Sequence, residues 1–376
     1  MSRLRVAVVA ESFLPSVNGV SNTVRHVVEQ LAALGHEPLV VAPGPGPSDH
    51  LGVPVARVRS VGLPTYRSFP VALPDATVER TLADFKPDVV HLASPMVLGA
   101  TGLKVARRLG VPTVAVYQTD VAGFARHYGV RADLLLDRWI GRLHRRADRT
   151  LVPSSASYAQ LEALRVPDLH VWRRGVSLDL FDPARRDPER HAVLSRDGRD
   201  VLVGYVGRLA PEKQVRRLAD IADLPGTRLV VIGEGPEREW LGRRLPRAHF
   251  TGRLGGEHLA TAFATLDVFV HTGESETFCQ TVQEAQASGV PVVAVARGGP
   301  LDLVDHGRTG LLYDPAAPYA LWRTVAALVR DQGLRTRLST AGREEVRDRS
   351  WENAVAALVD EHYLPVLRRH ARRATA

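Results

Sequence analysis

Several residue types are scarce in this chain of 376 residues, and each shortage excludes a class of protein. Cys279 is the only cysteine, so the chain forms no intramolecular disulfide and no metal site built from several cysteines. A single thiol suits a reducing cytosol, and we expect Cys279 to be a packing residue. No apolar run approaches the ~20 residues of a membrane-spanning helix, and the run after Arg3 and Arg5 ends at Glu11. These absences predict a cytoplasmic protein, soluble or bound peripherally to the inner face of the cell membrane.

The signatures of two other classes are also missing. Neither half opens with the G-x-G-x-x-G of a nicotinamide-dependent oxidoreductase, since Gly19 stands alone and Gly204 and Gly207 precede a basic loop. The net charge of +8 suggests nucleic-acid binding, but only 6% of residues are aromatic and no basic run is interleaved with stacking aromatics. There is no D-x-D, and 274–276 holds the nearest acidic pair. We therefore expect no nucleic acid partner, no metal and no cofactor.

A regular alternation of β-rich runs and amphipathic helical stretches predicts an α/β protein with parallel sheets covered by helices. A charged stretch with Gly175, Pro183 and Pro188 interrupts the alternation, so we interpret 172–196 as the connection between two domains. A helix is expected over 20–34, and a closing helix over 351–373, broken or bent near Pro365. The expected strands are 4–10, 39–42, 89–92, 113–117, 149–152, 201–207, 228–232, 249–251, 268–271 and 291–295.

Two glutamates, Glu276 and Glu284, flank an expected turn from a buried strand into a helix that stops at Gly289. Backbone N–H groups in the first turn of a helix lack internal partners, so such a turn can receive phosphate oxygens. The residues of this turn are Phe278, Cys279, Gln280 and Thr281. The two carboxylates can accept hydroxyl hydrogen bonds on either side, as a sugar and a ribose joined by a diphosphate require. The alternative is that both glutamates are solvated surface residues.

Two cations, Arg208 and Lys213, follow the β-rich run 201–207, at the carboxyl end of a strand and the start of the next helix. Ligands of open α/β sheets bind outside these strand ends, so the pair suits a diphosphate leaving group. Taken alone, two basic loop residues are usually solvated.

Several motifs in order give the chain a family resemblance over nearly its whole length. They are Pro15 to Val20, Gly207 to Lys213, Gly233-Glu234-Gly235, Glu276 to Glu284, Gly298-Gly299-Pro300 and Gly310-Leu311-Leu312. With them the chain resembles the retaining glycosyltransferases of family GT4. The runs 10–15 and 116–120 are most similar to actinobacterial GDP-mannose-dependent α-mannosyltransferases that act on glycolipids.

The resemblance implies the GT-B fold: two Rossmann-like domains whose parallel sheets face an interdomain cleft. It implies an acceptor-binding domain at 1–174, a donor-binding domain at 175–356, and a last helix, 357–376, that returns to the first domain. It further implies retention of anomeric configuration without a metal. Glu276 would hold sugar hydroxyls and Glu284 the ribose, while Arg208 and Lys213 neutralise the leaving diphosphate.

In the first domain, Gly19 follows a strand and precedes a helix, so its missing side chain allows backbone to approach the donor closely. Many GT4 members have a histidine facing the transferred sugar, where this chain has 117–120. Gln118 can orient a hydroxyl, whereas Asp120 can accept a proton, so we assign Asp120 to the acceptor hydroxyl and Gln118 to a sugar contact. Two alternatives remain: Asp120 caps a following helix, or His127 is the catalytic helper.

The donor base and sugar do not follow from the residues themselves. Nucleobases commonly meet backbone groups, here around Arg253 and Leu254, and backbone carries no residue code. GDP-mannose follows from the resemblance alone, and a UDP-sugar with a lipid or small-molecule acceptor stays the alternative.

Most of the excess positive charge lies in the first 180 residues and concentrates in 131–146, where leucines recur at helical spacing among arginines. A basic amphipathic helix can lie on an anionic membrane. We expect the leucines to pack in the core and the arginines to face lipid, where a glycolipid acceptor is presented. A second candidate surface is 57–67, with Pro64, Tyr66 and Phe69 beside it.

Overall fold

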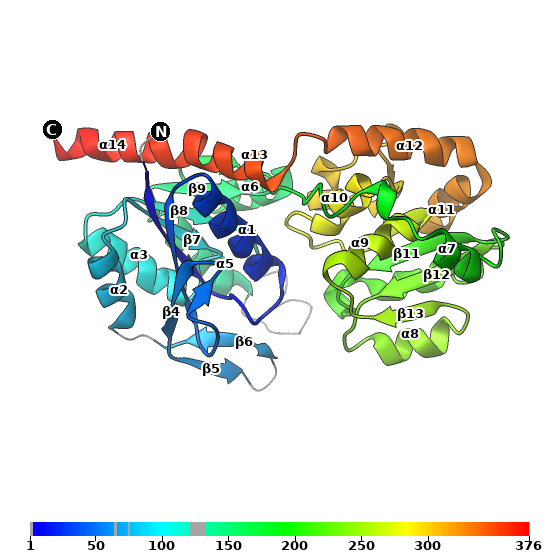
Figure 1. The fold of residues 1–376 in the computed structure, drawn as a ribbon, viewed down its shortest axis with the longest axis horizontal. Coiled ribbons are helices and arrows are strands. Elements are labelled where there is room, and N and C mark those ends of the chain that lie inside the picture. Colours follow the sequence, from blue (N-terminus) through cyan, green and yellow to red (C-terminus); the bar gives the residue numbers. More distant parts are fainter. Residues whose placement is uncertain (1–2, 64–65, 74–75, 121–132, 376) are drawn as a thin grey trace. The chain divides into compact units, whose positions relative to one another are not determined.

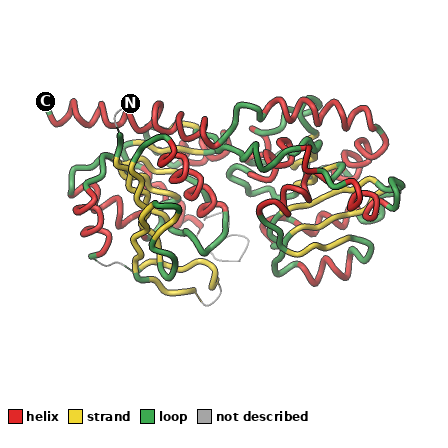
Figure 2. The backbone as a smooth tube through the Cα atoms, in the orientation of Figure 1, coloured by secondary structure: helices red, strands yellow, loops and turns green. Residues whose placement is uncertain are grey.

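The computed structural model describes residues 3–63, 66–73, 76–120 and 133–375. The chain divides into two compact units: unit 1 is Met1–Gly175 with Trp351–Ala376, and unit 2 is Val176–Ser350. In each unit, helices surround a sheet (Figure 1; Figure 2). Each unit also has its own buried apolar core.

Unit 1 is built on an eight-stranded sheet of order β10-β9-β8-β7-β1-β2-β4-β3, parallel except for the pair β3–β4. Its central strand β1 is buried almost throughout, as a parallel strand covered on both faces must be. The sheet's strands are β1 Arg5–Ala10, β2 Glu37–Pro43, β3 Asp49–His50, β4 Val53–Val58, β7 Val89–Ala93, β8 Thr113–Val116, β9 Arg149–Val152 and β10 Leu169–Val171. An antiparallel pair is separate: β5 Ser60–Leu63 and β6 Tyr66–Ala72.

The helices of unit 1 are α1 Gly19–Ala33, α2 Thr77–Phe85, α3 Leu98–Arg108, α5 Asp133–His144, α6 Ser155–Ala163, α13 Trp351–Ala357, the π-helix Leu358–Tyr363 and α14 Leu364–Ala374. The last three complete the core, since Trp351 and Tyr363 are buried against α1 and the sheet. The break expected near Pro365 is this π-helix. Proline has no N–H to bond the carbonyl of Glu361, and Arg149 Nη1 donates to that carbonyl at 2.7 Å instead.

Unit 2 is built on a fully parallel six-stranded sheet of order β13-β12-β11-β14-β15-β16. The strands are β11 Val201–Val206, β12 Thr227–Ile232, β13 His249–Gly252, β14 Val268–His271, β15 Val292–Val295 and β16 Leu311–Tyr313. The α-helices are α7 Pro188–Ser195, α8 Arg238–Arg244, α9 Gly256–Thr265, α10 Gln280–Ala287, α11 Ala320–Arg330 and α12 Gln332–Glu345. The 3-10 helices are η1 Pro183–Arg185, η2 Pro211–Lys213, η3 Val215–Ile221 and η4 Gly299–Asp302.

The strands and helices predicted from periodicity are confirmed within two residues at each end, and α1 begins at an Asn18 capping box. The prediction missed β4, the short edge strands β3, β10 and β16, and the pair β5–β6. After Lys213 the structure has a 3-10 helix, η3, in place of the helix expected there, and the 3-10 helix η2 precedes it.

The chain passes from unit 1 to unit 2 at Gly175 and Val176, inside the predicted connection 172–196, but the connection is much shorter than predicted. Trp172 is buried in the core of unit 1, and the chain enters unit 2 at Val176. Helix α7 contacts β11 and is therefore part of unit 2. The returning segment starts at Trp351, earlier than the expected 357. No helix in the described part of the chain is both long and apolar enough to cross a bilayer.

Candidate functional site

The carboxyl ends of the unit 2 strands meet along one edge of the sheet, because all six strands are parallel. The strand order places β12 on one side of β11 and β14 on the other. Connections from β11 and from β14 therefore leave in opposite directions, and the carboxyl ends at such a reversal are where open α/β sheets bind ligands. Arg208 and Lys213 follow β11, and Glu276 follows β14, so the structure brings these predicted residues to the same edge.

The loops after β11 and β12 pack backbone against backbone. Gly233 has φ +141, and a Cβ placed on it would lie 1.9 Å from the carbonyl oxygen of Gly207. The N–H of Leu209 donates to the carbonyl of Glu234 at 2.9 Å. This contact requires glycine and fixes the backbone on both sides of Arg208.

A three-residue ionic cluster joins the loops after β11 and β14. Lys213 Nζ lies 2.6 Å from Glu276 Oε1, and His271 Nε2 lies 3.4 Å from the same oxygen. The Thr272 hydroxyl also donates to the carbonyl of Lys213 at 2.8 Å. Glu276 thus contacts two cationic side chains at the carboxyl edge.

The charges of this cluster stabilise each other. Burial opposes ionisation of Glu276, but Lys213 and His271 outweigh it and hold the pKa of Glu276 well below its ordinary value. Burial likewise opposes the charged form of His271, yet Cys279 and Glu276 raise the pKa of His271 to about 9. The same carboxylate raises the pKa of Lys213 against the effect of burial.

Arg208 has its own carboxylate partner. Its Nη2 donates to Glu212 Oε1, and the Tyr205 hydroxyl donates to its backbone carbonyl at 3.2 Å. The Arg208 side chain is 40% exposed, whereas that of Glu212 is 8% exposed. The guanidinium is therefore accessible to a ligand while its counterion is buried.

The turn after Glu276 is clamped from the loop after β15. The N–H of Gly299 donates to the carbonyl of Glu276 at 2.8 Å, and a Cβ on Gly299 would lie 2.4 Å from the carbonyl oxygen of Phe278. Cys279 caps α10 with φ +81 and is buried, as expected of a packing residue. A left-handed cysteine costs about 1–3 kcal/mol and such strain gathers at functional sites.

Gln280 and Thr281 open α10, and Glu284 lies one turn further, in the interior. The Glu284 residue is 9% exposed. Burial raises the pKa of its carboxyl to about 7. Neither Glu276 nor Glu284 is a solvated surface glutamate, so that alternative is wrong. At the end of β13, Arg253 is exposed and Leu254 packs against the unit 2 core.

In unit 1 the structure brings Gly19 and Gln118 to one arginine. A Cβ on Gly19 would lie 3.9 Å from Arg174 Nη1, and Arg174 Nη2 donates to the carbonyl of Gln118 at 3.4 Å. Arg174 is buried, and the sequence had not marked it as a site residue.

Asp120 belongs to a hydrogen-bonded group at the end of β8. Its Oδ1 accepts from Gln160 Nε2 at 3.1 Å and from the Tyr117 hydroxyl at 3.4 Å. These donors orient the carboxylate that we assigned to the acceptor hydroxyl. The proposed helix cap and His127 both involve residues outside the described ranges.

The sequence missed Glu212 and His271 as members of the site. Each is one polar residue in a strand end or loop, and only the folded edge reveals that they contact Arg208 and Glu276. Their single signal was position: Glu212 falls within the family motif Gly207 to Lys213, and His271 ends the strand that precedes the motif Glu276 to Glu284.

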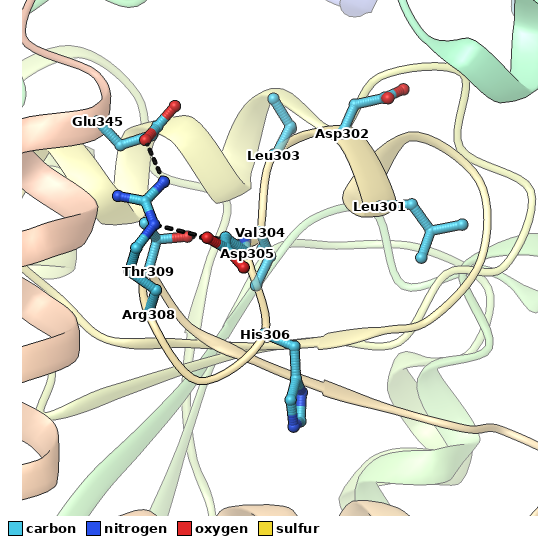
Figure 3. Close-up of a pocket in the computed structure, with 9 residues that line it drawn as sticks. All are labelled: Leu301, Asp302, Leu303, Val304, Asp305, His306, Arg308, Thr309 and Glu345. Atoms are coloured by element: carbon cyan, nitrogen blue, oxygen red, sulfur yellow. Dashed lines mark hydrogen bonds and ion pairs between the residues drawn. The ribbon is translucent and has the colours of Figure 1, made fainter.

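Among the described residues, no group of three or more His, Cys, Asp or Glu side chains is arranged to hold a metal. Glu274, from the nearest acidic pair, lies 2.9 Å from Arg217 Nη2 and 3.8 Å from Arg297 Nε. A surface pocket of about 320 Å³, lined by residues 301–306, Arg308, Thr309 and Glu345, contains none of the predicted site residues (Figure 3). Its Arg308 is paired with Asp305 and Glu345.

The chain matches two families. Residues 17–180 match the family described as Glycosyltransferase Family 4, and residues 187–345 match the family described as Glycosyl transferases group 1. These ranges correspond to most of the contiguous part of unit 1 and most of unit 2.

Individual proteins extend the match to the whole chain. A GDP-mannose-dependent alpha-mannosyltransferase of Mycolicibacterium smegmatis is 50% identical over 379 residues, covering 99% of this chain and 100% of that protein. An alpha-monoglucosyldiacylglycerol synthase of Acholeplasma laidlawii is 24% identical, covering 83% of this chain and 85% of that protein. Sucrose-phosphate synthase from Thermosynechococcus elongatus superposes with a TM-score of 0.80 at 21% identity, covering 99% of this chain and 100% of that one. The chain therefore belongs to glycosyltransferase family 4 and has the GT-B fold of two parallel-sheet, Rossmann-like domains.

Proposed function

We propose that this glycosyltransferase transfers mannose from GDP-mannose, with retention of configuration, to the hydroxyl of a glycolipid. The observation that carries the proposal is the placement of Arg208, Lys213 and Glu276 at the carboxyl edge of the unit 2 sheet, where Lys213 contacts Glu276. The mannose donor is supported by the 50% identity to a relative named as GDP-mannose-dependent.

Each residue has a role in this proposal. Arg208 and Lys213 neutralise the charge that develops on the leaving diphosphate, and the backbone from Phe278 to Thr281 receives its oxygens. Glu276 accepts hydrogen bonds from the sugar hydroxyls. Its low pKa keeps it ionised and therefore an acceptor.

The rest of the donor and the acceptor are assigned likewise. Glu284 accepts hydrogen bonds from the ribose, and the base lies at Arg253 and Leu254. Gly19 allows backbone of unit 1 to approach the donor, Gln118 contacts the sugar, and Asp120 takes the acceptor proton or orients its hydroxyl.

The reaction in this proposal needs no metal and no cofactor, because two cationic side chains do the work that Mg²⁺ does in other transferases. Turnover should be unchanged by EDTA. Activity abolished by EDTA and restored by Mg²⁺ would contradict it.

The nucleotide is tested by calorimetric titration with GDP and then UDP, without metal. Tighter binding of GDP supports the mannosyltransferase proposal, whereas a preference for UDP replaces it by a UDP-sugar transferase of the same family.

Lys213→Ala should lower kcat by about 10²–10³-fold, as loss of one preorganised cationic donor does. Lys86→Ala, which changes an exposed lysine of unit 1 at the end of α2, is the control.

The lipid acceptor is supported by a groove of about 730 Å³ between α3 and α5. Exposed Lys104, Arg107, Arg142 and Arg146 surround it, with Trp139 42% exposed at its side.

Leu134 and Leu135 of α5 are each 66% exposed, which corrects the expectation that the leucines of this helix are all in the core. Apolar side chains among cations suit an anionic membrane, each cation near the surface contributing about 1 kcal/mol. A relative named for a glucosyldiacylglycerol product also supports a lipid acceptor.

The second candidate surface is weaker, because Arg57 donates to the carbonyls of Leu14, Pro43 and Pro47 and so does not face lipid.

Vesicle flotation tests the membrane proposal. Binding should rise with the fraction of anionic lipid and fall in Arg142→Ala/Arg146→Ala, while Arg335→Ala in unit 2 leaves it unchanged. No dependence on anionic lipid would remove the membrane from the proposal.

A further inference from the structure

The loop after β11 carries a carboxylate that the proposed chemistry does not use. Glu212 lies on η2, between the two residues assigned to the diphosphate. Its side chain is 8% exposed and is ion-paired to Arg208. A carboxylate beside a diphosphate would repel the ligand unless a cation neutralises its charge, as Arg208 does for Glu212.

The contacts of Arg208 fix this residue at both ends. At the backbone end, the Tyr205 hydroxyl donates to its carbonyl at 3.2 Å. At the side-chain end, Nη2 donates to Glu212 Oε1. Because a guanidinium is planar with its donors in a rigid fork, holding one nitrogen sets the direction of the others.

Glu212 is itself held in place. Leu209, Ala210 and Val215 on either side of it are fully buried, and Pro211 begins η2 with a fixed φ. Lys213 meets Glu276 at 2.6 Å, so the two cations of this loop each have a carboxylate contact.

We propose that Glu212 is a positioning residue, which holds the Arg208 guanidinium in the orientation that stabilises the leaving diphosphate. The inference rests on the proposed function. A donor oriented before the reaction needs no reorganisation when charge develops, so a loss of orientation lowers kcat more than it lowers ground-state binding.

The test is Glu212→Gln, which keeps the shape and removes the charge. Its matched control is Asp200→Asn. Arg196 and Asp200 form the same kind of i,i+4 pair, with the arginine 63% and the carboxylate 5% exposed, but at the amino end of β11. Both variants and the wild type are assayed with GDP-mannose and titrated with GDP, and far-UV circular dichroism verifies the fold of each.

We expect E212Q to lower kcat by about tenfold or more, as misplacement of a catalytic group does. The KM for GDP-mannose and the Kd for GDP should change by less than about threefold, and D200N should behave as wild type. In an Arg208→Ala background, adding E212Q should cause no further loss, since the two residues act as a unit.

Wild-type or raised kcat in E212Q would overturn the inference, as would a full additional loss in the Arg208→Ala background. The failure of the proposed function gives a different result. If the wild type does not turn over GDP-mannose, the proposed function fails. If Arg208→Ala alone keeps wild-type turnover, the transfer stands but Arg208 does not stabilise the diphosphate, and the positioning role of Glu212 fails with it. If Arg208→Ala is impaired and E212Q is not, only the positioning role fails.

Discussion

Glu284 is a buried carboxyl in helix α10, and its burial opposes its ionisation. Its folded pKa of about 7 lies above the ordinary value of 4.5. As the pH rises from about 4.5 through 7, the unfolded chain ionises this group while the folded protein keeps it protonated, so stability is lost over that range. Glu284→Gln should therefore raise the free energy of unfolding at pH 8 by about 2–3 kcal/mol and have no such effect at pH 4.

The same substitution should weaken binding of GDP, because a glutamine amide offers one acceptor oxygen in place of two for the ribose hydroxyls. Urea unfolding at pH 4 and pH 8 and calorimetric titration measure the two effects. A variant that is more stable at pH 8 but binds GDP as wild type would leave the burial argument intact and refute the ribose contact.

His271 should make stability depend on pH in the alkaline range. Its folded pKa of about 9 lies above its ordinary 6.5. The stabilisation is fully present below about pH 6.5 and is lost as the pH rises through 9, by a few kcal/mol in total. We expect the difference in unfolding free energy between wild type and His271→Gln to shrink over that range.

His144→Gln is the control, since His144 is also buried but burial lowers its pKa to about 3. Above about pH 7.5 it is neutral in both the folded and the unfolded state, so its substitution should not change how the unfolding free energy depends on pH from there to pH 9. If both substitutions, or neither, change the pH dependence of the unfolding free energy, the ionisation of His271 does not govern that dependence.

The residues that the sequence made predictable are those that share a local motif. Glu276 and Lys213 stood out because their strands and turns could be recognised, and the structure joins them at 2.6 Å. Arg174 had no such signal. It lies near Gly19 only because the chain returns beside α1 at the end of unit 1, which is a tertiary contact that no local pattern encodes.

At the scale of elements, the loops after β11 and β12 depend on glycines that allow their backbones to come into contact. Gly233→Ala should destabilise unit 2 by about 3–5 kcal/mol, because it combines an unfavourable φ with a Cβ that would lie 1.9 Å from the Gly207 oxygen. It should also weaken binding of GDP, since the loop that carries Arg208 must shift.

Gly226→Ala separates the two causes. Gly226 also has a positive φ, +70, but a Cβ there meets nothing within 4 Å. Its substitution should cost only the left-handed conformation, about 1–2 kcal/mol, and leave GDP binding unchanged. Equal losses of stability in both variants, measured by urea unfolding, would exclude the close contact as the cause.

The elements predicted correctly include the Val-rich strands β1 and β11, whose continuous apolar runs are typical of strands buried on both faces. The errors have physical reasons. Strands β10 and β16 have three residues each at sheet edges, too few to show a period. After Lys213, residues 215–221 have a helical pattern of apolar residues that a 3-10 helix satisfies equally well.

At the scale of the whole chain, the two units differ in whether their residues are contiguous in the sequence. Unit 2 is one continuous segment, whereas unit 1 needs the distant segment Trp351–Ala376. That segment adds Trp351, Leu358 and Tyr363 to the main core of unit 1. Trp172 Nε1 donates to the carbonyl of Ala354 at 2.8 Å, and His91 Nδ1 lies 2.7 Å from the Tyr363 hydroxyl.

A chain that ends at Ser350 should therefore lose the fold of unit 1 and keep that of unit 2. Removing a buried aromatic side chain alone costs about 3–5 kcal/mol, and this truncation removes two together with several aliphatic residues. Hydrogen exchange should show protection lost in residues 3–175 and kept in 176–350, and calorimetry should still detect binding of GDP.

A chain that ends at His370, which removes mainly exposed residues, is the control and should behave as wild type. If the chain ending at Ser350 keeps protected amides in β1 and β7, the core of unit 1 is complete without the returning segment, whose role would then be to join the two units.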